Sequence, residues 1–259
     1  MDLTGLAAFF PLISLILGLV LGSFYNVCIH RYIHSASVVR PASHCPACGH
    51  ILRWWENIPL VSYILLQGKC TACRQPISIR YPAVEGISGL WALLLALSFG
   101  PGWAWLVYMV FGGLLVIISF IDLEIFILPD AFTLPGGLLA FLCAAFLLGI
   151  GWKASLLGGA IGAGGFWLLQ KGYKLLKGVE GMGTGDIKLM FLLGALLGWQ
   201  ALPLVVFFAA ISGLAVSLFY LRKAGSQGLQ TAIPFGPFLS LGGMLYILWG
   251  RELWRWYLG

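Results

Sequence analysis

The sequence predicts an all-α polytopic membrane protein of about eight transmembrane helices, with a small zinc-binding cytosolic loop domain between the first and second spans. The chain of 259 residues is 60% hydrophobic and only 9% charged, with a mean hydropathy of +0.96. These values lie far outside the range of soluble domains. Long uncharged stretches recur along the chain, and the one sizeable hydrophilic segment, residues 28–83, holds four of the 6 cysteines.

The predicted spans come from stretches that lack Asp, Glu, Lys and Arg. These stretches are residues 6–27, 86–121, 131–152, 154–170, 189–221 and 224–250. A helix crosses the hydrocarbon with roughly 20 apolar residues, so two of the stretches are too long for one helix. We expect breaks at Gly100 to Gly102 and near Gly198 to Pro203, because Gly and Pro together favour a turn. The result is eight spans.

The basic residues predict the orientation, because loops rich in Lys and Arg stay in the cytosol. With the N-terminus outside, 12 of the 15 Lys and Arg residues lie on the cytosolic side and 3 outside. The cytosolic residues are Arg31, Arg40, Arg53, Lys69, Arg74, Arg80, Lys171, Lys174, Lys177, Lys188, Arg222 and Lys223, and the outer ones are Lys153, Arg251 and Arg255. The net charge of +6 therefore reflects topology, not nucleic-acid binding. No basic residue precedes the first apolar run, so we expect this span to stay in the mature protein.

Two C-x2-C pairs in the hydrophilic segment predict a structural zinc site. The pairs are Cys45 with Cys48 and Cys70 with Cys73. Four thiolates in two such turns can occupy the corners of one tetrahedron, and Gly49 allows a tight turn beneath the metal. Because four protein sulfurs close the coordination shell, we expect no catalytic metal here.

The sequence leaves several alternative roles open for the cysteine and histidine residues. Two disulfides are the main alternative, although cytosolic thiols are kept reduced. A thioredoxin-like redox pair is another, but no βαβ pattern surrounds the cysteines. His44 and His50 flank the first pair and could replace a ligand. Cys28 and Cys143 lie in or beside apolar segments and are expected to pack there.

Two aspartates lie at the ends of apolar segments, where a charge is costly and marks a functional site by default. Asp122 follows an uncharged span in FIDLEIFILPD, and Asp186 precedes the next one in GMGTGDIKLM. Both fall on the cytosolic side of the predicted topology, so they can face each other. Two neighbouring carboxylates share a proton, which leaves one as a base for water and the other as an acid. This is the chemistry of aspartic proteases.

The glycines before Asp186 are expected to give the backbone freedom at the membrane edge. Gly183 and Gly185 would allow a substrate strand to approach the carboxylate. Taken alone, Asp186 could also cap the N-terminus of a helix.

Three further charged residues have no assigned role. Glu124 and Asp130 are explained equally well as solvated side chains or as caps of a helix that begins near Ala131. Lys188 would not share a helical face with Asp186. It could anchor the topology or contact a lipid phosphate.

An ordered series of motifs over nearly the whole chain resembles the type IV prepilin peptidases, or leader peptidases, which belong to the GxGD membrane aspartyl proteases. The motifs are GSFYNVCIHR (22–31), the two cysteine pairs, ENIPLVSYILLQGKC (56–70), IRYPAVEGISG (79–89), IDLEIFILPD (121–130), GMGTGDIKL (181–189) and IPFGPFL (233–239). Tyr25 and Cys28 are small departures in the opening motif. The resemblance implies that Asp122 and Asp186 are the catalytic pair.

The resemblance also implies substrates, a cofactor and a location. Members cleave the short basic leader of prepilins or pseudopilins after a glycine, on the cytoplasmic face of the bacterial inner membrane. Many then methylate the new N-terminal residue with S-adenosylmethionine, and members with the complete cytosolic domain are the bifunctional ones. No glycine-rich cofactor fingerprint is present, so the candidate cofactor-binding residues are polar ones around this domain. They are Asn26, Arg31, Glu56, Asn57, Arg80 and Glu85.

The predicted organisation has three parts: a first helix at 1–27, the zinc-binding, methyltransferase-associated domain at 28–83, and a membrane aspartyl peptidase domain at 84–259. The rival functions are a transporter or channel with paired carboxylates and a non-enzymatic pilus or secretion assembly factor. A transporter predicts carboxylates near the middle of the bilayer and related helical halves. The sequence shows neither feature.

Overall fold

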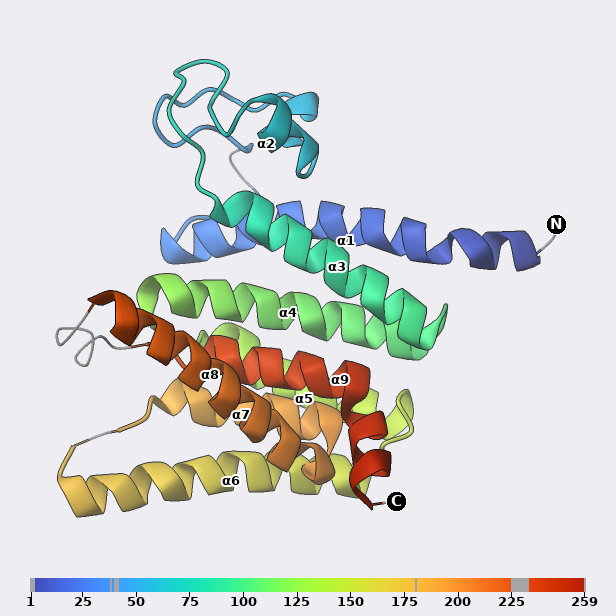
Figure 1. Ribbon diagram of the computed structural model, residues 1–259, viewed down its shortest axis with the longest axis vertical. Helices are drawn as coiled ribbons and strands as arrows, with labels where there is room; N and C mark the ends of the chain where they lie inside the picture. The colour runs from blue at the N-terminus through green and yellow to red at the C-terminus, as the bar shows by residue number, and fades with distance from the viewer. Residues whose placement is uncertain (1–2, 38, 40–41, 180, 225–232, 259) are drawn as a thin grey trace. The chain divides into compact units, whose positions relative to one another are not determined.

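Figure 1 shows the computed structural model, which describes residues 3–37, 39, 42–179, 181–224 and 233–258. Arg40 of the predicted cytosolic loop lies outside these residues. Within the described ranges the chain is helical and forms no strand, only two isolated β-bridges. The elements are α1 (Leu3–Ile33), η1 (Trp54–Asn57), α2 (Val61–Leu65), α3 (Arg80–Phe99), α4 (Trp103–Ile125), α5 (Asp130–Phe146), α6 (Trp152–Lys177), α7 (Thr184–Leu197), η2 (Trp199–Ala201), α8 (Leu202–Ala224) and α9 (Gly236–Leu258).

The long helices fall where the uncharged stretches are. The two predicted breaks are present, since α3 ends at Phe99 before α4 begins at Trp103, and α7 ends at Leu197 before η2. Among the described residues, 4 segments are both long and apolar enough to cross a membrane. They are Ala8–Ile33, Arg80–Phe99, Trp103–Ile125 and Trp199–Phe219, and α5 is a shorter apolar helix. The chain is thus a helical membrane protein.

Glycines with positive φ end three of these helices, and one of them, Gly178, is in the left-handed helical conformation. Gly100 after α3 has φ of 65°, Gly178 after α6 has 75° and Gly198 after α7 has 82°. A residue with a side chain rarely adopts these angles, so glycine at this position is a common stop signal for a helix. The breaks in the apolar sequence therefore have a local backbone cause.

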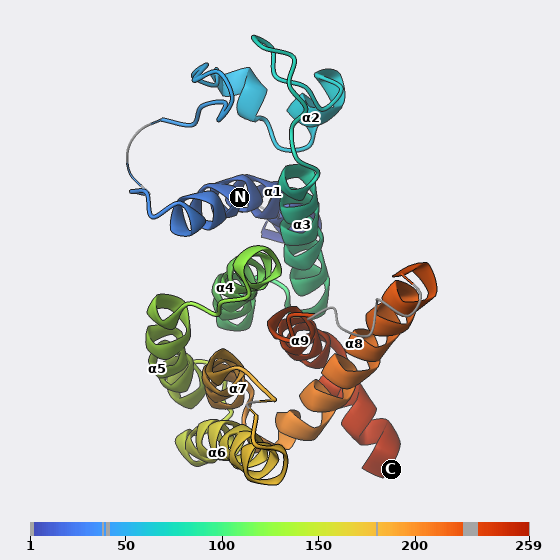
Figure 2. The same cartoon turned by 90° about the vertical axis from the view of Figure 1, so that its left-hand side faces the viewer.

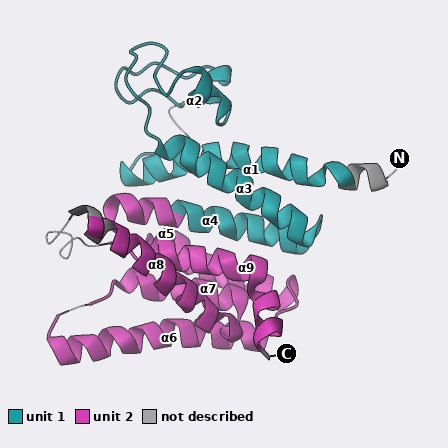
Figure 3. Cartoon of the chain, in the orientation of Figure 1, with its two compact units in different colours: residues 1–117 teal, residues 118–259 magenta. Residues whose placement is uncertain are grey.

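The chain divides into two compact units, Met1–Ile117 and Ile118–Gly259 (Figure 3). In the first unit, α1 packs along α3. A Cβ on Gly18 of α1 would lie 2.5 Å from the Cβ of Ala92, and the Ser14 hydroxyl donates to the Ala92 carbonyl at 2.7 Å. Helix α1 continues to Ile33, and helix α3 begins at Arg80. Each helix therefore includes several residues of the hydrophilic segment predicted at 28–83.

In the second unit, α7 is the central helix and packs against α5, α6 and α9 (Figure 2). Small residues let α6 and α7 approach closely, since a Cβ on Gly158 would lie 2.1 Å from the Gly194 carbonyl oxygen. The side chains of Leu189, Leu192 and Leu193 are fully buried. The close packing of α7 therefore holds its first turn, which carries Asp186, in place.

Candidate active site and metal centre

The first cysteine pair forms a tight turn, here called knuckle 1. The Cys45 N–H donates to the His50 carbonyl, and the Gly49 N–H donates to the Cys45 carbonyl, both at 2.9 Å. Gly49 has φ of 71°, as its predicted role in the turn requires. An antiparallel bridge between His44 and Ile51 closes the turn.

The second cysteine pair, knuckle 2, repeats this pattern. The Cys70 N–H donates to the Gln75 carbonyl at 2.9 Å, and the Arg74 N–H donates to the Cys70 carbonyl at 3.0 Å. A bridge between Lys69 and Pro76 closes this turn. Arg74 occupies the position of the glycine in knuckle 1 and has φ of 61°, a left-handed conformation that costs energy for a residue with a side chain.

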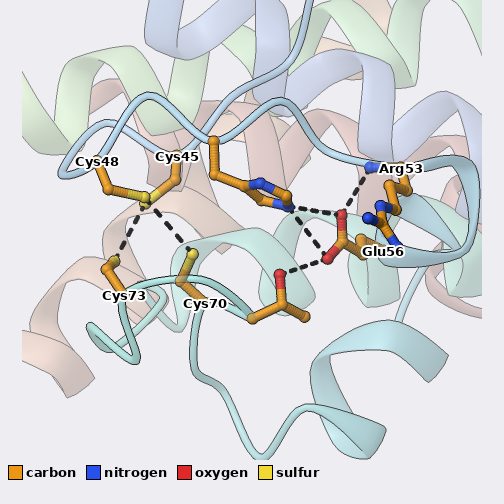
Figure 4. A network of polar contacts seen from close by, with 8 residues as sticks. Cys45, Cys48, Arg53, Glu56, Cys70 and Cys73 are labelled. Carbon is orange, nitrogen blue, oxygen red and sulfur yellow. Dashed lines mark hydrogen bonds and ion pairs between the residues drawn. The ribbon is translucent and has the colours of Figure 1, made fainter.

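The two knuckles bring their four sulfurs together (Figure 4). All four lie within 4.8 Å of one another, with Sγ of Cys45 at 3.8 Å from that of Cys73 and Cys48 at 4.0 Å from Cys70. Zinc with four sulfurs at about 2.3 Å places neighbouring sulfurs about 3.8 Å apart, so the cluster fits a tetrahedral ion. These distances are too long for disulfides, and the cysteines are free.

No other described residue joins the four sulfurs as a potential ligand. The Nδ1 atom of His44 instead lies 2.9 Å from the Ala42 carbonyl oxygen, and His50 contacts Glu56. Cys28 in α1 and Cys143 in α5 are outside the cluster.

Glu56 fastens the two knuckles together (Figure 4). Its side chain is only 3% exposed, and Oε2 accepts the Arg53 N–H at 2.6 Å. Nε2 of His50, just after knuckle 1, lies 3.2 Å from Oε2, and the hydroxyl of Thr71 in knuckle 2 donates to Oε1. The hydrogen bond from Arg53, together with those from Thr71 and His50, lowers the pKa of Glu56 to about 2. The carboxylate is therefore ionised wherever thiolates can hold a metal.

Asp122 lies in the last turn of α4 and is buried. The Gly236 backbone N–H, at the start of α9, donates to Oδ2 of Asp122 at 3.1 Å. A Cβ on Gly236 would lie only 2.6 Å from this oxygen. A glycine is therefore required for the backbone to approach the carboxylate so closely.

Asp186 is the third residue of α7 and is also buried. The helix is capped by Gly183, whose backbone N–H bonds the Asp186 carboxylate. Asp186 is thus not the N-cap residue; its side chain accepts from the N-cap backbone from the third position of the helix. The same carboxylate interacts electrostatically with Asp122. The structure brings the two predicted aspartates into one site.

Leu128 packs between the backbone of Gly185, which precedes Asp186, and that of Gly236, which donates to Asp122. A Cβ on Gly185 would lie 2.6 Å from the Leu128 Cβ, and one on Gly236 would lie 2.8 Å from its Cδ2. Position 185 therefore requires a glycine because Leu128 leaves no room for a side chain there. Gly183 has φ of −70°, so it does not use the freedom that the sequence suggested, but a Cβ there would be in ordinary contact, 3.6 Å from Oδ2 of Asp186.

The other acidic residues near this site have different surroundings. Asp130 begins α5 and forms an ion pair with Lys188 of α7 at 2.5 Å. This pair links the starts of two helices, a role for Lys188 that the sequence did not suggest. Glu124 is exposed at the end of α4.

Two of the candidate cofactor-binding residues, Asn26 and Glu85, are buried where α1 packs along α3. Asn26 donates through Nδ2 to the carbonyl oxygens of Gly22 and Tyr81, at 3.4 and 3.0 Å. Its Oδ1 is buried with no hydrogen-bond partner among the described residues. Glu85 accepts the Leu60 N–H at 2.8 Å. These two acceptors fit a ligand that carries N–H donors.

The remaining candidates are arranged differently. Arg31 is buried and donates to the Ser37 carbonyl. The Arg80 guanidinium lies 5.0 Å from the Tyr81 ring centre, and Asn57 is exposed. Glu56 belongs to the knuckles, as described above. Asn26 and Glu85 thus lie where α1 packs along α3, and Glu56 lies in the knuckle domain.

The fold and the two sites define a helical membrane protein with a buried carboxylate pair and a four-cysteine knuckle domain. Residues 16–99 match the bacterial peptidase A24 N-terminal domain, and residues 109–218 match the type IV leader peptidase family. Three relatives called prepilin leader peptidase/N-methyltransferase are similar to the chain over most of their length. That of Pseudomonas putida is 36% identical (95% of this chain, 93% of the relative), that of Aeromonas hydrophila 38% (96% and 94%), and that of Pseudomonas aeruginosa 37% (96% and 93%).

The chain belongs to the type IV leader peptidase family, as its motifs indicated. No solved structure matches it significantly. Sequence reasoning assigned no role to Gly236 and Leu128, although both lie in the quoted motifs IPFGPFL and IDLEIFILPD. The adjacent glycine and proline in the first motif were the available signal of a tight approach.

Proposed function

We propose that this protein is a prepilin leader peptidase that also N-methylates the residue exposed by cleavage. The observation that carries the peptidase assignment is the buried, interacting pair Asp122 and Asp186. The names of the relatives support both activities. The substrates are type IV prepilins or pseudopilins, cut after the glycine that ends the short basic leader.

In this proposal the two aspartates activate one water molecule. One carboxylate accepts a proton as the water oxygen attacks the peptide carbonyl, and the other gives its proton to the leaving amine. The Gly236 N–H holds one oxygen of Asp122, which leaves the other oxygen for the water. A substrate backbone would approach Asp186 along Gly183, the N-cap of α7, which carries no side chain.

The position of the aspartates favours this reaction over ion transport. Asp122 lies in the last turn of α4 and Asp186 in the first turn of α7. Both are at helix ends, whereas a transport pathway is expected to place its carboxylates near the middle of the bilayer. A leader peptide entering from the aqueous side reaches helix ends first.

The four cysteines would hold one structural zinc ion, and their spacing supports this. The metal would fix the two knuckles relative to each other and take no part in cleavage. Metal analysis of the reduced, purified protein tests the assignment. We expect one zinc per chain, and a value well below one would contradict the proposal.

Methyl transfer would use the polar residues around the knuckle domain. S-adenosylmethionine supplies the methyl group when bound. The buried acceptors Asn26 Oδ1 and Glu85 support binding of an amino group, and Arg31 and Arg80 could bind a carboxylate. Asn57 is exposed and could contact the edge of the bound S-adenosylmethionine. Glu56 would instead hold the knuckles in place through its hydrogen bonds.

The proposed setting is the bacterial inner membrane, with the active site on the cytoplasmic side. The excess of Lys and Arg in that set of loops supports the orientation. Eight spans, and the division into 1–27, 28–83 and 84–259, remain our working description of the topology. The order of the helices supports the number, because each predicted span corresponds to one helix, although α5 with 17 residues and α7 with 14 are shorter than the others.

Mass spectrometry of a reconstituted reaction tests the proposed function. The purified protein is incubated in lipid with a pilin precursor, with and without S-adenosylmethionine. We expect loss of the leader in both reactions and one added methyl group only when the cofactor is present. An intact precursor would contradict the peptidase assignment, and a cleaved product without the methyl group would remove the second activity.

A further inference from the structure

The loop domain exposes a group of large apolar side chains next to its knuckles. This group, here called the η1–α2 surface, consists of Trp54, Trp55, Val61, Ile64 and Leu65. Trp54 is 76% exposed, Ile64 71% and Leu65 75%. Single exposed apolar residues are ordinary, but a contiguous group of this kind marks an interaction site.

The geometry of α2 places its apolar residues on one face. Val61, Ile64 and Leu65 follow the i, i+3, i+4 spacing of a single helical face. Tyr63 turns the other way, since its ring lies against Gly68 and its hydroxyl donates to the Ile77 carbonyl at 3.4 Å. The helix is therefore attached to knuckle 2 by Tyr63 and leaves the apolar face uncovered.

The chain holds this surface close to a membrane. It enters the loop domain from α1 and returns through α3, and both helices include segments long and apolar enough to cross a bilayer. Figure 1 shows α2 beside the first turns of α3, and the N–H of Leu60, just before α2, donates to Glu85 of α3 at 2.8 Å. A segment in this position meets the headgroup region, where tryptophan side chains are enriched.

The charges around the surface suit an anionic lipid headgroup. Arg53, Lys69 and Arg74 are exposed, and the Arg53 guanidinium lies 5.1 Å from the Trp55 ring centre. Glu56, the acidic residue of the described segment 42–79, is buried within the knuckles. The exposed charges of this segment are therefore all positive, and they attract anionic lipids.

We propose that the η1–α2 surface is a membrane-interface anchor that holds the knuckle domain on the bilayer. Trp54, Ile64 and Leu65 enter the boundary between headgroups and acyl chains, and the basic residues contact lipid phosphates. The anchor limits the motion of a domain that joins the helices at Ile33 and Arg80 and contacts α3 through the hydrogen bond from Leu60 to Glu85. It does not depend on either enzymatic activity.

Photo-crosslinking in a defined bilayer tests this proposal. The full chain carries the photoreactive residue p-benzoylphenylalanine at Leu65 and is placed in nanodiscs of phosphatidylethanolamine and phosphatidylglycerol. Gln75 is the matched control position, because it is exposed in the same domain but lies outside the η1–α2 surface. After irradiation, mass spectrometry measures the fraction of chains with a covalent lipid adduct.

We expect about tenfold more lipid adduct at Leu65 than at Gln75, as for a residue on an interfacial helix. Equal yields at the two positions would overturn the proposal, and so would crosslinks from Leu65 mainly to protein. The zinc content of each variant verifies that the knuckles have formed. If the Leu65 variant loses zinc, Ile64 takes its place with the same expected result.

Discussion

The Gly236 backbone N–H donates a hydrogen bond to Oδ2 of Asp122 at 3.1 Å, which joins the end of α4 to the start of α9. The two residues are 114 positions apart in the chain. A backbone donor adds no side chain to the site and accepts no proton. It can therefore fix the orientation of the carboxylate without competing for its chemistry.

The first prediction concerns this contact. In a Gly236→Ala variant the new Cβ would lie 2.6 Å from Asp122 Oδ2 and 2.8 Å from Leu128 Cδ2, so the carboxylate must move. Displacement of a catalytic group by about 1 Å can cost roughly 100-fold in rate. We expect a loss of this size in the cleavage rate of a pilin precursor, measured by gel shift or mass spectrometry.

A matched alanine substitution is available in the same unit. Gly164 lies in α6, and a Cβ there would meet no atom within 4 Å. Gly164→Ala should leave cleavage unchanged. Equal effects of the two substitutions would show that the loss at Gly236 comes from altered helix stability and not from its contact with Asp122.

The second prediction concerns the hydrogen bonds by which the Glu56 carboxylate links the two knuckles, here called the Glu56 clasp. Removing the carboxylate with Glu56→Ala leaves the Arg53 N–H and the Thr71 hydroxyl without their acceptor. The knuckles would then lose their direct link, and groups that orient metal ligands typically contribute 10- to 100-fold to affinity. We expect zinc affinity to fall by about this factor in a competition titration with a chelator.

The neighbouring residue provides the control for the clasp. Asn57 follows Glu56 in η1 but is exposed. Asn57→Ala should keep the zinc affinity of the wild type. If Glu56→Ala also keeps it, the clasp does not position the cysteines.

The third prediction compares corresponding positions in the two knuckles. Gly49 and Arg74 both have positive φ, at 71° and 61°. Since a left-handed residue with a side chain costs about 1–2 kcal/mol, Gly49→Ala should destabilise the knuckle domain by roughly 1 kcal/mol. Arg74→Gly should not destabilise it, because glycine adopts the angle freely. The denaturant midpoint of zinc release measures both, and a loss in Arg74→Gly equal to that in Gly49→Ala would contradict this explanation.

The local patterns were sufficient to predict the helices and the cluster of four cysteines. Uncharged stretches located the long helices, and the C-x2-C spacing located the four sulfurs that the structure brings together. The motif resemblance predicted the family, which the relatives confirm. These features depend on residues close together in the chain.

Features that depend on distant packing could not be predicted in the same way. The ion pair of Lys188 with Asp130 and the approach of Gly236 to Asp122 join segments from different helices. Gly185 was assigned to backbone freedom, whereas the structure shows a close contact with Leu128. Glu56 was a cofactor candidate because a lone polar residue in a sequence carries no sign of the partners that surround it.

The most direct test is the cleavage of a pilin precursor by Asp122→Asn and Asp186→Asn variants, with Glu124→Gln as the exposed control. Each aspartate variant loses a proton donor or acceptor, and general acid–base catalysis contributes about 100- to 10,000-fold. We expect cleavage to fall by at least about 100-fold in both aspartate variants and to persist in the control, with zinc content unchanged in all three. Substantial cleavage by either aspartate variant would contradict the assignment of the pair.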